Sequence, residues 1–61
     1  MDTFTAELRQ RITAAREALR TAKEAGDLDS ERIYSGELDS LLRLAMENNV
    51  TVPEDRSGDE S

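Results

Sequence analysis

The chain has 61 residues, no cysteine, no histidine and a formal net charge of −6 at pH 7. A chain this short forms one domain at most, and its core is too small to be comfortably stable alone. The composition excludes disulfides and the ordinary zinc or haem ligand sets, so we expect no metal and no cofactor. Association with another chain is the remaining route to stability.

The charges are distributed unevenly along the sequence. Residues 1–26 carry four acids and five bases, residues 27–49 carry six acids and two bases, and residues 50–61 carry four acids and one base. The acidic balance disfavours binding to nucleic acid or anionic lipid, because both require neutralisation of phosphates. No apolar run has the length of a membrane span, and no signal-peptide pattern is present. We therefore expect no membrane partner and a cytoplasmic location.

The first predicted element is a helix over about 4–25. Leu8, Ile12 and Leu19 follow the spacing of one helical face. The segment contains six alanines and no internal glycine or proline, which favours helix formation. Three alanines flank the apolar face: Ala14, Ala18 and Ala25. They either reflect helix propensity on a half-exposed surface or allow a second hairpin to approach closely.

A basic stripe runs along the same helix. It consists of Arg9, Arg16, Arg20 and Lys23. If the chain reverses after residue 26, Lys23 lies opposite Glu31, and Arg16 lies opposite Glu37, so cross-hairpin ion pairs are one interpretation. A second interpretation is a nucleic-acid contact surface, although the stripe has no interleaved aromatic residues for base stacking. A third is a solvated helix face.

A turn over 26–28 separates the first helix from a second helix over about 28–48. Gly26 can end the first helix in a left-handed conformation, and Asp27 is the predicted N-cap of the second. Apolar residues of the second helix cover an arc of roughly 200°, which one facing helix cannot cover. Gly36 lies mid-helix, away from this arc, either as a tolerated weak position or as a point of close backbone approach. Val50 is expected to fold back onto Ala45.

These patterns predict an all-α fold, an antiparallel two-helix hairpin that dimerises into a four-helix bundle. The hairpin spans residues 1–52, and residues 53–61 are expected to form a disordered acidic tail. The predicted interface residues are Leu8, Ile12, Leu19, Tyr34, Leu38, Leu41, Leu42 and Ala45.

The function that these features favour is a small protein–protein interaction module, such as an adaptor, regulator or assembly factor. Its partner would be a second copy or another helical protein. The alternative is a dimeric nucleic-acid-binding hairpin that uses the basic stripe. We expect no enzyme, because no catalytic motif is present, although Tyr34 and Glu37 lie one helical turn apart and could share a cleft in an oligomer.

Overall fold

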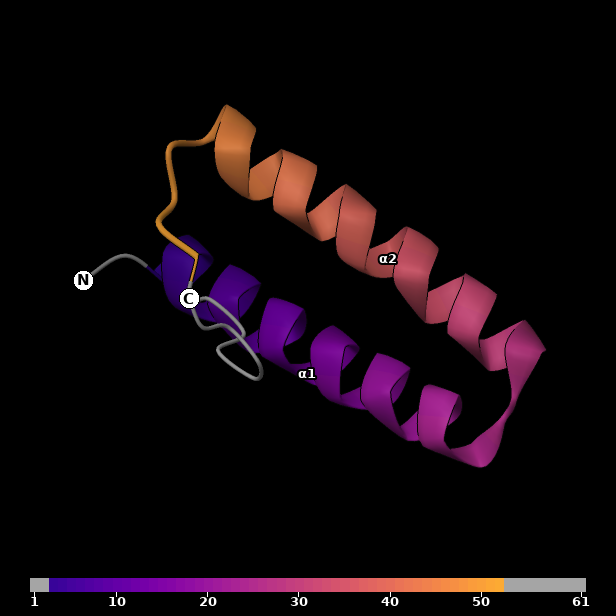
Figure 1. Cartoon of the computed structure of the whole chain (residues 1–61). Helices are drawn as coiled ribbons and strands as arrows, with labels where there is room; N and C mark the ends of the chain where they lie inside the picture. The colour runs from indigo at the N-terminus through magenta and orange to yellow at the C-terminus, as the bar shows by residue number, and fades with distance from the viewer. Residues whose placement is uncertain (1–2, 53–61) are drawn as a thin grey trace, which may run out of the picture.

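The computed structural model describes residues 3–52, which form two antiparallel α-helices joined by a short turn (Figure 1). Helix α1 spans Thr3–Ala25 and helix α2 spans Leu28–Glu47. The two helices pack against each other, so the predicted helical hairpin is confirmed. Neither helix is long and apolar enough to cross a membrane. The expected acidic tail over 53–61 lies outside the described residues.

The turn between the helices uses a glycine and an aspartate. Gly26 has a φ of +70°, a backbone conformation that costs glycine little and other residues more. The amide of Asp27 donates to the Ala22 carbonyl over 2.9 Å, which closes the end of α1 as a Schellman motif. The Asp27 carboxylate then accepts from the amide of Ser30 over 3.1 Å and caps the start of α2. Gly26 therefore ends the first helix and Asp27 begins the second, as the sequence predicts.

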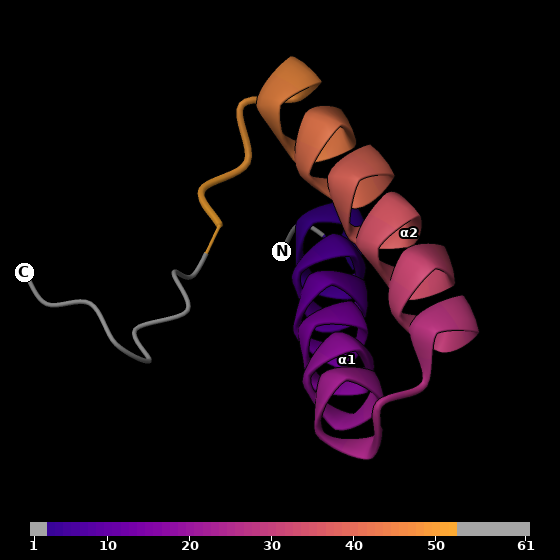
Figure 2. The same ribbon diagram turned by 45° about the vertical axis from the view of Figure 1, so that its right-hand side comes forward.

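Helix α2 ends with the same kind of motif. Asn49 adopts a φ of +57°, which asparagine tolerates better than most residues. The amide of Val50 then donates to the Ala45 carbonyl over 2.8 Å, and its side chain packs against the core. This confirms that the chain folds back after α2. Residues 48–52 return from α2 towards the first turns of α1 (Figures 1 and 2).

The core lies between the two helices, near their open end. Leu8, Ile12 and Ala45 form its buried cluster. Partly buried side chains pack around this cluster: Leu38, Leu41, Leu42, Val50 and Val52. Ile12 is the one large side chain of the described residues that is completely buried. The core is therefore small, as expected for a chain of this length, and it leaves several large apolar side chains in contact with solvent.

Candidate functional site: an uncovered face of the hairpin

The predicted interface residues lie mainly in the seam that joins α1 to α2. Leu8, Ile12 and Ala45 are buried. The others are half-buried: Leu19, Tyr34, Leu38, Leu41 and Leu42. Because these side chains hold the hairpin together, a partner would meet mainly their neighbours on the helix flanks.

One side of the hairpin is covered by its own chain. The Arg9 side chain donates from Nε to the Thr51 carbonyl oxygen over 2.8 Å, which fixes residues 48–52 beside α1. Arg9 and Arg11 are two residues apart in a helix, so their side chains leave it about 160° apart. The side that carries Arg11 therefore faces away from the covering segment.

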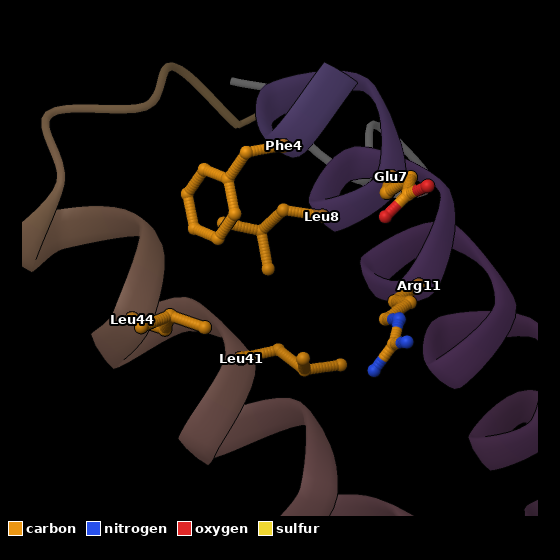
Figure 3. A pocket seen from close by; sticks show the side chains of 6 residues that line it. All are labelled: Phe4, Glu7, Leu8, Arg11, Leu41 and Leu44. Atoms are coloured by element: carbon orange, nitrogen blue, oxygen red, sulfur yellow. The ribbon is translucent and has the colours of Figure 1, made fainter. Parts of the chain in front are cut away.

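That uncovered side contains a shallow hollow at the open end of the hairpin (Figure 3). Phe4 of α1 points towards Leu44 of α2, and Leu41 lies below them. The hollow has a volume of about 200 Å³ and is lined by Phe4, Glu7, Leu8, Arg11, Leu41 and Leu44. Its lining is mostly apolar, with one acidic and one basic side chain from α1.

A second hollow of about 280 Å³ lies near the turn. It is lined by Ala18, Thr21, Ala22, Ala25, Asp27, Ser30 and Tyr34. Small side chains from α1 make up most of this lining. The hollow contains Tyr34 but not Glu37. A cleft that these two residues share in an oligomer stays a prediction from the sequence.

Helical spacing places both hollows on the same face. In α1, positions 4, 7, 11, 14, 18, 21 and 25 follow alternating steps of three and four and so form one stripe. In α2, Ile33 and Leu44 are eleven residues apart and therefore leave the helix within about 20° of each other. We call this side the two-hollow face. It comprises Phe4, Glu7, Arg11, Ala14, Ala18, Thr21 and Ala25 of α1 with Ile33, Glu37, Leu41 and Leu44 of α2.

The two-hollow face combines exposed apolar groups with charges. Phe4 is 45% exposed, Ile33 64% and Leu44 38%. Arg11 and Glu37 are also exposed, and neither forms an ion pair within residues 3–52. The face therefore exposes both apolar area and charges of opposite sign to solvent.

The residues of the basic stripe differ in their contacts and in their burial. Arg9 is engaged by the backbone of residue 51, and Arg20 lies 4.0 Å from Glu17 one turn earlier in α1. Arg16 is half-buried. No ion pair joins Lys23 to Glu31 in the described part of the chain, so that expected cross-hairpin pair is not formed.

Among the described residues, Asp27 has a clearly shifted pKa. Two hydrogen bonds from Ser30 lower the pKa of Asp27 from its usual value. The bond from the Ser30 hydroxyl contributes most, and the bond from the Ser30 amide contributes next. This shift belongs to the helix cap. No cluster of acidic side chains suited to a metal ion occurs between residues 3 and 52.

The two-hollow face does not coincide with the most apolar positions of the sequence. Glu7 and Arg11 interrupt the apolar pattern, which hides the stripe that runs from Phe4 to the flanking alanines. The regular spacing of three and four residues was the available signal. Comparisons with protein-family models, curated proteins and solved structures found no match to this chain.

Proposed function

We propose that the chain is a small helical protein–protein interaction module that self-associates through the two-hollow face into a four-helix bundle. The observation that carries this proposal is the exposure of Phe4, Ile33 and Leu44 on the side that residues 48–52 leave uncovered. Phe4 and Leu44 line one hollow, and exposed apolar side chains that lie together in this way are typical of interaction sites.

The size of the face supports a dimer. A 20-residue helix is about 30 Å long, and two packed helices are about 20 Å wide, which gives a projected area of about 600 Å². The accessible area of a corrugated surface exceeds its projection. The face therefore approaches the roughly 800 Å² per partner that stable complexes bury.

Two substitutions in the last turns of α2 test the proposal. Leu44 and Met46 are both exposed but leave the helix about 160° apart, so only Leu44 lies on the two-hollow face. Leu44→Glu should shift the chain towards monomer in light scattering coupled to size exclusion. Met46→Glu, which adds the same charge two residues away, should leave association unchanged.

Circular dichroism first establishes that both variants keep their helicity. Equal effects of the two substitutions on association would contradict the assignment of the face. A wild-type chain that stays monomeric at millimolar concentration would contradict self-association itself.

Nucleic-acid binding through Arg9, Arg16, Arg20 and Lys23 remains a prediction from the sequence. A gel shift that weakens with salt and disappears in the Arg16→Glu variant would support it.

A further inference from the structure

We infer that the two-hollow face receives a second copy of this chain in antiparallel orientation, with the turn of each hairpin beside the open end of the other. In this arrangement Phe4 of each copy enters the partner's small-residue hollow, and Arg11 pairs with the partner's Glu37. The inference rests on the proposed self-association and specifies its geometry.

A two-fold axis can relate two stacked hairpins in two ways. An axis along the helices places turn beside turn and α1 over the partner's α2. An axis across the helices places turn beside open end, α1 over the partner's α1 and α2 over the partner's α2. Both are closed, self-complementary arrangements, so the residues on the face must decide between them.

The α1 stripe fits the axis that runs across the helices. Ala14 lies at the middle of the stripe, where a small side chain lets the two α1 helices come close. With the axis at Ala14, Phe4 lies within about 1.5 Å of the level of the partner's Ala25. The hollow beside Ala25 has about 280 Å³, and a cavity of about 150 Å³ already accepts a benzene ring. The exposed ring of Phe4 therefore has a matching recess on the partner.

The α2 stripe fits the same axis. Counted from the turn at a rise of about 1.5 Å per residue, Ile33 lies about 9 Å before the level of Ala14 and Leu44 about 7.5 Å beyond it. The two-fold axis reverses the direction of these distances from Ala14 in the partner. Ile33 therefore meets the partner's Leu44 to within about 1.5 Å along the bundle, and each exposed side chain gains an apolar neighbour.

The charges also match in this orientation. Arg11 lies about 4.5 Å from the level of Ala14 towards the open end, and Glu37 lies about 3 Å from it towards the turn. The axis therefore brings Arg11 to the level of the partner's Glu37, to within about 1.5 Å along the bundle, on the diagonally opposed helix. Both side chains must reach across the centre of the bundle to pair. A charged layer between apolar ends fixes register and orientation in helical bundles. In the other arrangement, with the axis along the helices, Arg11 and the partner's Glu37 are about 7.5 Å apart along the bundle. The two small-residue hollows then face each other, and Phe4 enters neither of them.

The absence of cysteine from the sequence allows a direct test of orientation. In an Ala14→Cys variant, the two thiols of an antiparallel dimer lie beside the axis, within reach of a disulfide. The control is Thr13→Cys, an exposed neighbour that points away from the two-hollow face. Under mild oxidation, Ala14→Cys should form covalent dimer at least about tenfold faster than Thr13→Cys, which corresponds to about 1.4 kcal/mol.

Sedimentation of the wild-type chain separates the two possible failures. A wild-type dimer whose Ala14→Cys variant cross-links no faster than Thr13→Cys would overturn the antiparallel orientation and leave the proposed function intact. A wild-type monomer would overturn both.

Charge reversal tests the Arg11–Glu37 pair independently. Arg11→Glu or Glu37→Arg alone should weaken the dimer by roughly tenfold or more, because each places like charges together. The double variant, which restores opposite charges, should recover most of the wild-type affinity. Additive losses in the double variant would show that the two residues do not meet.

Discussion

Ile12 offers the most direct test of what holds the hairpin together. Its side chain is completely buried against Leu8 and Ala45. Replacing a buried isoleucine by alanine costs about 2–5 kcal/mol, because transfer free energy is lost and a cavity remains. A domain of this length has a total stability of about 3–9 kcal/mol at 0.05–0.15 kcal/mol per residue. Ile12→Ala should therefore remove a large part of the free energy of unfolding.

A graded series makes the magnitude measurable. Ile12→Val should cost about 1 kcal/mol and lower the Tm by roughly 5 °C. The assay is thermal unfolding followed by circular dichroism at one fixed chain concentration, since association would make Tm concentration-dependent. Met46→Ala, at a position 75% exposed, is the matched control and should melt close to the wild type. An Ile12→Ala variant that melts with the wild type would refute the assignment of the core.

Three further predictions follow from local features of the described chain. Gly36→Ala should raise stability by about 1 kcal/mol in thermal unfolding, since no atom lies within 4 Å of the added Cβ; a fall in dimer affinity would instead reveal a second backbone at this position. Asp27→Ala should lower the Tm at neutral pH. The pKa of Asp27 is lower in the folded chain than in the unfolded chain, so its ionised carboxylate stabilises the fold at neutral pH. This contribution is lost as the pH falls through the folded pKa. A Tm difference between the variant and the wild type that stays constant into the acid range would count against the charged cap. Arg9→Ala should speed hydrogen exchange of the Val50 amide, because the contact with Thr51 that fixes the returning segment is lost; unchanged exchange with unchanged helicity would show that the segment is held by its apolar side chains alone.

Local sequence signals predicted the hairpin well. Gly26 and Asp27 are a helix terminator and an N-cap in adjacent positions, and each acts through its own backbone or side chain within a few residues. The return of Val50 onto Ala45 is likewise a contact between neighbours in the chain. Such features need no knowledge of the rest of the fold, which is why they could be predicted.

The position of the two-hollow face could not be predicted in the same way. It depends on which flank residues 48–52 cover, and that follows from the direction in which the chain leaves α2 after the positive φ of Asn49. The hydrogen bond from Arg9 to Thr51 joins residues 42 positions apart, and no local pattern encodes it. Helical periodicity predicts the width of the apolar arc. The contact between Arg9 and Thr51 decides which flank of that arc remains exposed.

If a second copy covers the exposed apolar side chains of the two-hollow face, the wild-type chain is a dimer in solution. Sedimentation equilibrium of the wild-type chain over a wide concentration range measures this. We expect a mass of twice the 6.8 kDa chain, with dissociation only at the lowest concentrations. A mass of 6.8 kDa at every concentration would contradict this expectation.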